Sequence, residues 1–204
     1  LTMRKNVLYI DTENGAAQIM GRTIQSTLQR TKSEIVSGDC DLVERRHMRK
    51  YKKLKVELAV HRIPAMLGDA NDIRTIIRTI EAERGIKINI LCVDYAGKMA
   101  SIKKDEDDFT RISNVYIDLQ NLAMDEKLDA VWTAHHITRD GSKHVGTKYE
   151  ENDISGAISI VRNAVAIWGL NQTPEERDNN IQRMELVVQR EGKPTGRALF
   201  HIDV

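Results

Sequence analysis

The stretch Cys92-Val93-Asp94-Tyr95-Ala96-Gly97 follows the largely apolar segment 86–91 and ends it with a carboxylate. A short apolar run of this kind predicts a buried strand. Open parallel sheets bind nucleotide with Mg²⁺ at the carboxyl ends of their strands, where Asp94 would lie. A turn or a helix cap is the other common reason for an aspartate at such a position. The stretch therefore predicts a parallel α/β sheet and makes Asp94 a candidate Mg²⁺ ligand.

The composition describes an ordinary globular chain. The 204 residues are 41% hydrophobic and 30% charged, which fits one soluble α/β domain over residues 1–204. The net charge of +1 gives no global field for nucleic acid, so such binding would depend on local loops. Cys40 and Cys92 lie far apart and suggest neither a disulfide framework nor a zinc site. Without an apolar stretch of membrane-span length or a signal-peptide core, we expect an intracellular protein with no membrane partner.

Strand-like and helix-like segments alternate along the chain. This alternation predicts βαβ units and a mainly parallel sheet flanked by helices, with antiparallel strands at the C-terminal end. The expected strands are 6–10, 58–63, the run that ends at Asp94, 130–134, 164–170, 183–189 and 198–202. The expected helices are 16–30, 39–57, 69–84 and 107–127.

Polar residues follow three of the predicted strands. Glu13 follows the first, Asp94 closes another, and His135-His136 follow the strand 130–134. If these strands are neighbours, the polar residues line one crevice. A carboxylate that positions water, a carboxylate that holds Mg²⁺ and a polar group that reads a terminal phosphate are what NTP hydrolysis needs. Each also has an ordinary structural interpretation, as a surface residue of a helix's first turn or a strand-end histidine.

In this order the residues resemble the RecA-like motor domain of DnaB-type replicative helicases, including the phage ring helicases. The resemblance spans nearly the whole chain. It is carried by Val7-Leu8-Tyr9-Ile10-Asp11-Thr12-Glu13 with Ala16 to Arg22, Val93-Asp94-Tyr95, His135-His136-Ile137-Thr138-Arg139, Ile154-Ser155-Gly156-Ala157-Ile158, and Arg190-Glu191-Gly192 with Pro194-Thr195-Gly196.

The resemblance implies an ATPase that uses ATP with Mg²⁺ at the subunit interfaces of a homo-hexameric ring. In that family pattern, Glu13 activates the attacking water and Asp94 holds Mg²⁺, directly or through water. His136 senses the terminal phosphate, and Arg190 reaches the neighbouring subunit's site as an arginine finger. The resemblance also implies a primase or a helicase loader as partner, and the cytoplasm of a bacterial cell or a phage-infected bacterium.

The segment 138–150 carries cations among glycines, a composition that suits contacts with a phosphate backbone. We expect Arg139, Lys143 and Lys148 to bind single-stranded DNA, with Ser155 and Gly156 beside them by resemblance. A solvated surface loop is the alternative. The basic run within residues 45–55 has its charges spread round a helix, which is typical of a solvated face.

The chain also departs from the family pattern. No G-x-x-x-x-G-K-[ST] phosphate loop occurs in it, so we expect it to be the downstream part of a longer protein, with a degenerate ring subunit as the alternative. A RecA core without its first strand would leave central backbone groups unpaired, which favours truncation. Val188, Asp153 and the additional Lys193 replace family features, so the resemblance extends to Arg190 and not to a second phosphate contact.

Two other functions fit the same residues. A RecA-like recombinase or clock-type ATPase would bind nucleic acid or a partner without unwinding. A catalytically silent ring subunit or loader-type interaction module would need no phosphate loop. Strand displacement separates the helicase from the first of these, and nucleotide binding separates both ATPases from the second.

Overall fold

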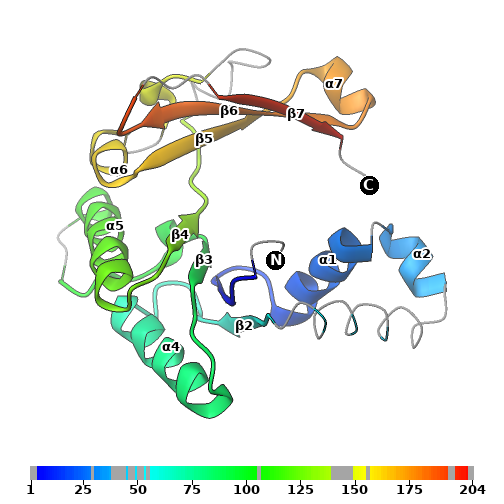
Figure 1. The fold of residues 1–204 in the computed structure, drawn as a ribbon. Coiled ribbons are helices and arrows are strands. Elements are labelled where there is room, and N and C mark those ends of the chain that lie inside the picture. Colours follow the sequence, from blue (N-terminus) through cyan, green and yellow to red (C-terminus); the bar gives the residue numbers. More distant parts are fainter. Residues whose placement is uncertain are drawn as a thin grey trace. The chain divides into compact units, whose positions relative to one another are not determined.

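The computed structural model describes residues 4–28, 30–37, 45, 49, 53, 56–104, 107–138, 149–154, 157–192 and 196–201. It consists of two compact units, Leu1–Ala134 and His135–Val204, which are described separately below (Figure 1). The single domain predicted over residues 1–204 stays a prediction.

The first unit is built on a four-stranded parallel sheet with the order β2-β1-β3-β4. Its strands are β1 (Val7–Asp11), β2 (Leu58–Arg62), β3 (Ile90–Asp94) and β4 (Ala130–Thr133). All three pairings are parallel, which confirms the mainly parallel sheet predicted from the alternation of segments. The three strands that precede Glu13, Asp94 and His135 are β1, β3 and β4, and they are successive neighbours in this sheet.

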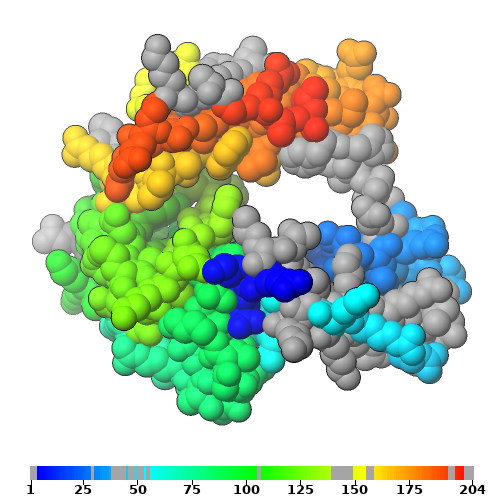
Figure 2. All heavy atoms as spheres, viewed as in Figure 1, coloured from blue at the N-terminus to red at the C-terminus, as the bar shows by residue number. Residues whose placement is uncertain are grey.

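Asn6 ties the start of β1 to both sides of the sheet. Its side-chain oxygen accepts a hydrogen bond from the backbone N–H of Glu57 (2.9 Å), and its own N–H donates to the side chain of Asn89 (3.1 Å). Lys5 forms an ion pair with Asp129 at 2.8 Å. Figure 2 shows this N-terminal stretch, in dark blue, against the green segments of the same unit. These contacts anchor the strand whose far end carries the candidate site.

Four helices of the first unit are described: α1 (Ala16–Leu28), α2 (Lys32–Ser37), α4 (Ala70–Arg84) and α5 (Asp108–Asp125). The boundaries of α4 follow directly from its sequence. Asp69 accepts hydrogen bonds from the first-turn N–H groups in a capping box with Asp72, and Gly85 ends the helix in the left-handed conformation, with φ at 63°. Glycine adopts that conformation without the steric cost that a side chain brings.

Strand alternation divides the sheet into two faces. Leu8 and Ile10 of β1 are fully buried in one hydrophobic cluster with residues of α4 and α5, and Tyr9 and Asp11 therefore point to the opposite face. The helices contribute Ile73, Ile77, Val115, Leu119 and Leu122 to the cluster. One face thus forms the core, while polar groups on the other lead to the ends of the strands.

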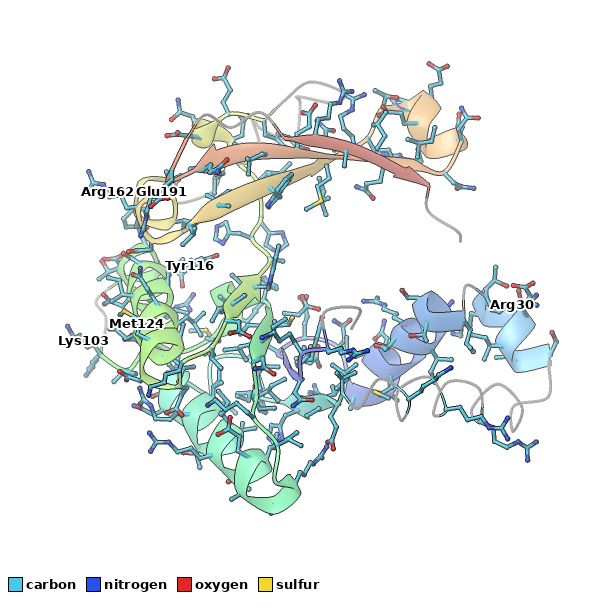
Figure 3. All side chains as sticks on the ribbon, viewed as in Figure 1. Arg30, Lys103, Tyr116, Met124, Arg162 and Glu191 are labelled. Atoms are coloured by element: carbon cyan, nitrogen blue, oxygen red, sulfur yellow. The ribbon has the colours of Figure 1, made fainter. Side chains whose placement is uncertain are left out.

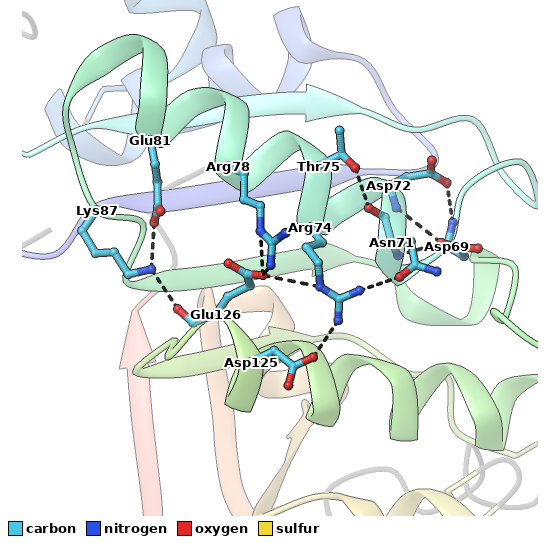
Figure 4. A network of polar contacts seen from close by, with 10 residues as sticks. All are labelled: Asp69, Asn71, Asp72, Arg74, Thr75, Arg78, Glu81, Lys87, Asp125 and Glu126. Carbon is cyan, nitrogen blue, oxygen red and sulfur yellow. Dashed lines mark hydrogen bonds and ion pairs between the residues drawn. The ribbon is translucent and has the colours of Figure 1, made fainter.

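A buried carboxylate joins α4 to the end of α5 (Figure 4). Glu126 is 7% exposed and accepts from Arg78 through Nε (3.1 Å) and Nη2 (2.8 Å), with Arg74 Nε at 3.4 Å. Arg74 also pairs with Asp125 at 2.8 Å, and Lys87 donates to the backbone carbonyl of Glu126 at 2.8 Å. The network fixes the two helices against each other on the core side of the sheet.

The second unit contains an antiparallel sheet with the order β5-β6-β7. Its strands are β5 (Ala166–Asn171), β6 (Ile181–Gln189) and β7 (Arg197–His201), which confirms the predicted antiparallel C-terminal end. The helix α6 (Ala157–Asn163) precedes β5, and the short helix α7 (Pro174–Asp178) joins β5 to β6. Thr173 starts α7 through a capping box with Glu176.

The structure adds short elements that the pattern did not predict, among them α2, α6 and α7. The predicted helix 16–30 ends at Leu28. Most of the predicted helix 39–57 lies outside the described residues, and its described members Arg45, Arg49 and Lys53 are helical. Within the described part of the chain, the helices are too short or too polar to cross a bilayer.

The Glu126 network yields a stability prediction. Replacing Glu126→Gln removes the charge that two arginines share, and we expect the free energy of unfolding to fall by about 1.5–3 kcal/mol, the range for hydrogen bonds to charged groups. Urea unfolding followed by circular dichroism measures this change. Glu83→Gln, at an exposed position of the same helix, is the control and should stay within about 0.5 kcal/mol. Equal effects of the two substitutions would contradict a structural role for the network.

Candidate functional site

The site begins with two aspartates at the ends of neighbouring strands. Asp11 closes β1, Asp94 closes β3, and the two are partners in the parallel register. Tyr9 lies on the same face as Asp11, two residues earlier, and its hydroxyl reaches Asp94. The face opposite the core therefore ends in a pair of carboxylates at the edge where parallel α/β sheets bind ligands.

Thr12 joins the two strand ends. Its N–H and its hydroxyl both donate to the carbonyl oxygen of Asp94, at 2.9 and 3.0 Å, and the hydroxyl oxygen accepts from the N–H of Tyr95 at 3.1 Å. A threonine hydroxyl can donate and accept at the same time. Glu13 follows directly, with its side chain exposed. The structure therefore places Glu13 next to a residue that is bonded to the Asp94 backbone.

The Asp94 carboxylate is partly buried and held by a phenol. Tyr9 Oη donates to Asp94 Oδ2 at 2.8 Å, the one hydrogen bond to this carboxylate from the described residues. Burial raises the pKa of Tyr9, and the hydrogen bond to Asp94 and the negative charge of Asp94 raise it further. Tyr9 therefore stays protonated at neutral pH and remains a donor that orients the carboxylate.

The segment after Asp94 is fixed from several sides. The N–H of Ala96 donates to the hydroxyl of Thr133, at the end of β4, at 2.9 Å. Arg111 of α5 donates to the carbonyl oxygens of Gly97 (3.0 Å) and Met99. These contacts hold the exit of β3 against β4 and α5, so that the Asp94 backbone is constrained on both sides.

The oxygen atoms at this edge fit Mg²⁺. That ion is bound through one or two carboxylates together with water and substrate phosphates, and it seldom has a complete protein cage. Asp94 supplies one carboxylate, and the buried oxygen Oδ2 of Asp11 has no hydrogen-bond partner among the described residues. Those residues contain no group of three or more histidine, cysteine, aspartate or glutamate side chains placed to hold a metal. The chain thus offers the partial site typical of a nucleotide-bound cation.

His136 belongs to the second unit. It is exposed and precedes Ile137, which forms an antiparallel bridge with Ile154. The N–H of Thr138 donates to the carbonyl oxygen of Asp153 at 2.7 Å. His136 therefore lies at the start of a short bridged segment, three residues after the end of β4.

Arg190 also belongs to the second unit, directly after β6. Its N–H donates to the carbonyl oxygen of Val165 at 2.9 Å, and its Nη2 donates to the carbonyl oxygen of Arg162 in the last turn of α6 at 2.8 Å. Figure 3 labels Arg162 and Glu191 at this place. The guanidinium is exposed and has five N–H donors, so one bond to Arg162 leaves it able to bind an anion.

The predicted DNA-binding residues cannot be placed in this way. Arg139, Lys143, Lys148, Ser155 and Gly156 all lie outside the described residues. Of the other predicted site residues, Glu13 and Asp94 are brought to one edge of the first unit, and His136 and Arg190 lie in the second. Their roles stay predictions.

Tyr9 and Asp11 were not predicted as site residues. A signal for them exists, because alternation along the strand 6–10 places both on the face opposite Leu8 and Ile10. What the sequence does not show is that this face lies beside Asp94, which depends on the register of β1 with β3.

Comparison with known proteins finds similarity in structure and none in sequence: no family model and no curated protein matches the chain. A DnaB-like replicative helicase, solved in a study of its interactions with primase, superposes with a TM-score of 0.78 at 14% identity. The match covers 98% of this chain and 49% of that one, so the chain spans about half the length of this helicase.

The ATPase domain of a second helicase superposes with a TM-score of 0.75 at 16% identity, over 95% of this chain and 70% of that one. The similarity at these identities is one of fold. The strand order, the helices and the antiparallel C-terminal strands all agree with it. The chain therefore has the RecA-like fold of DnaB-like replicative helicase ATPase domains.

Proposed function

We propose that the chain is the motor domain of an ATP-dependent replicative DNA helicase. In this proposal it couples ATP hydrolysis at the subunit interfaces of a homo-hexameric ring to translocation on single-stranded DNA and to duplex unwinding. The observation that carries it is the register of β1 with β3, which brings Asp94 and the backbone before Glu13 together at the ligand-binding edge of a helicase-type fold.

In the first unit, the residues divide the work of hydrolysis. Bound with ATP, Mg²⁺ neutralises the charge that develops on the phosphates. Asp94 holds this cation, directly or through water, and Tyr9 keeps one carboxylate oxygen in a fixed direction. Glu13 is exposed beside the Thr12 bridge and orients the attacking water as its proton acceptor.

In the second unit, the residues read the phosphate and complete the neighbour's site. His136 senses the terminal phosphate and passes its state to the segment 138–150. Arg190 contributes its guanidinium to the adjacent subunit, where an arginine finger is worth roughly 10³ to 10⁵ in rate. Arg139, Lys143, Lys148, Ser155 and Gly156 contact single-stranded DNA. A primase or a helicase loader is the expected protein partner, as the first structural neighbour was studied with primase.

The decisive test combines two measurements on the full-length protein. DNA-stimulated ATP hydrolysis tests the motor, and displacement of one strand from a forked duplex tests the helicase. Hydrolysis without displacement would identify a recombinase-like or other ring ATPase. Absence of nucleotide binding would identify a silent interaction subunit and overturn the proposal.

The arginine finger predicts a specific separation of binding from hydrolysis. Arg190→Ala should lower the hydrolysis rate by roughly 10³-fold or more, because the transition-state charge loses its guanidinium. ATP affinity should stay near that of the wild type, as measured with a fluorescent nucleotide. Arg177→Ala, an exposed arginine of the same unit, is the control. Near-normal turnover by the Arg190 variant would reject this assignment.

Glu13 predicts a second such separation. Glu13→Gln keeps the size of the side chain but removes the proton acceptor, and we expect hydrolysis to fall by about 10²- to 10⁴-fold. Binding of ATP with Mg²⁺ should be retained, since the exposed side chain is assigned to water rather than to the cation. Single-turnover hydrolysis measures the first quantity, and nucleotide titration measures the second. A parallel loss of affinity and rate would instead give Glu13 a role in binding.

The DNA-binding residues predict a change in salt dependence. Replacing Lys143→Ala and Lys148→Ala together should weaken single-stranded DNA binding and reduce the slope of log K against log salt by about 0.7 for each phosphate that is no longer neutralised. Fluorescence anisotropy at several salt concentrations measures both effects. The double variant Lys103→Ala with Lys104→Ala removes two exposed charges from the first unit as the control. An unchanged affinity and slope would place Lys143 and Lys148 away from DNA.

A further inference from the structure

Asp11 is a buried carboxylate with one oxygen left over. Its side chain is 0% exposed. Oδ1 accepts from the backbone N–H of Asn14 at 2.9 Å and from the Asn14 amide at 3.4 Å. Oδ2 is buried with no hydrogen-bond partner among the described residues. Buried polar atoms are costly without partners and are seldom left so in folded proteins, so Oδ2 calls for a ligand.

The position of Asp11 indicates which ligand. It is the register partner of Asp94, and adjacent strands lie about 4.8 Å apart. The negative charges of both aspartates raise the pKa of the same phenol, Tyr9, which places both carboxylates near its hydroxyl. Asp11 and Asp94 therefore lie side by side at one end of one face of the sheet.

Each of the two carboxylates is held by one oxygen. Asp11 uses Oδ1 for Asn14, and Asp94 uses Oδ2 for Tyr9. Within the described part of the chain, neither forms an ion pair with lysine, arginine or histidine. Arg62 is opposite Asp11 on β2, but its side chain is exposed and makes no ion pair with it. Two neighbouring carboxylates without a counter-charge repel each other, and a bound cation relieves that repulsion.

We propose that Asp11 is the second carboxylate of the divalent-cation site, and that its Oδ2 holds, directly or through one water, the cation held by Asp94. The inference rests on the proposed function and deepens it. A pair of carboxylates completed by water and phosphate oxygens is a ligand set that suits Mg²⁺. A turn role alone explains Oδ1, which receives the Asn14 bonds, and leaves Oδ2 unexplained.

The test is cation affinity in the full-length protein with ADP, using Mn²⁺ in place of Mg²⁺ and electron paramagnetic resonance to count free Mn²⁺. Asp11→Asn keeps an oxygen acceptor for Asn14 but removes the charge, and we expect Mn²⁺ affinity to fall about 10-fold or more, as it does when groups supporting a metal are removed. Asp94→Asn should fall at least as far. Asp129→Asn, an exposed aspartate of the same unit, should bind Mn²⁺ like the wild type.

The outcomes separate this inference from the proposed function. If the wild type binds Mn²⁺, Asp94→Asn loses it and Asp11→Asn does not, Asp11 is only a turn residue and the inference is overturned alone. If the wild type binds no Mn²⁺ with ADP, the ATPase proposal fails as well.

A second measurement needs no substitution and therefore does not depend on the folding of a variant. Fe²⁺ bound in place of Mg²⁺ generates hydroxyl radicals that cut the backbone nearby. Cleavage within both 9–13 and 92–96, suppressed by excess Mg²⁺, supports the shared site. Cleavage within 92–96 alone overturns it.

Discussion

The parallel register of β1 with β3 is the constraint on which the candidate site depends. It sets Asp11 opposite Asp94 and brings the Tyr9 hydroxyl within 2.8 Å of the Asp94 carboxylate. A shift of one residue would move every side chain of β1 to the other face, placing Tyr9 in the core and Leu8 at the polar edge. The buried apolar residues that fix this register are therefore also the residues that assemble the polar site.

The remainder of the first unit keeps that register in place. Leu8 and Ile10 are fully buried against the helices α4 and α5, which the Glu126 network links to each other. Asn6 fixes the opposite end of β1 through its bonds to Glu57 and Asn89. The strand is therefore held along its core face and at its beginning, and its polar end is positioned by contacts some distance from the chemistry.

Much of this fold could be predicted from the sequence because its signals are local. The α4 helix is indicated by Asp69, Gly85 and isoleucines at helical spacing, and apolar runs mark the strands. Helices of five to seven residues, such as α6 and α7, carry too few turns for a clear period. Asp94 was found because it ends an apolar run. Asp11 has the local pattern of a turn residue, and only its burial and its partner across the sheet, which are long-range properties, distinguish it.

Thr12 has a consequence for how the site moves. Its side chain and its backbone both bind the carbonyl oxygen of Asp94, and its peptide bond leads directly to Glu13. Any displacement of the β3 end is therefore transmitted through one residue to the backbone that carries Glu13. The carboxylate assigned to the cation and the one assigned to water thus travel as a single rigid lever, and their spacing is kept while the rest of the ring changes shape.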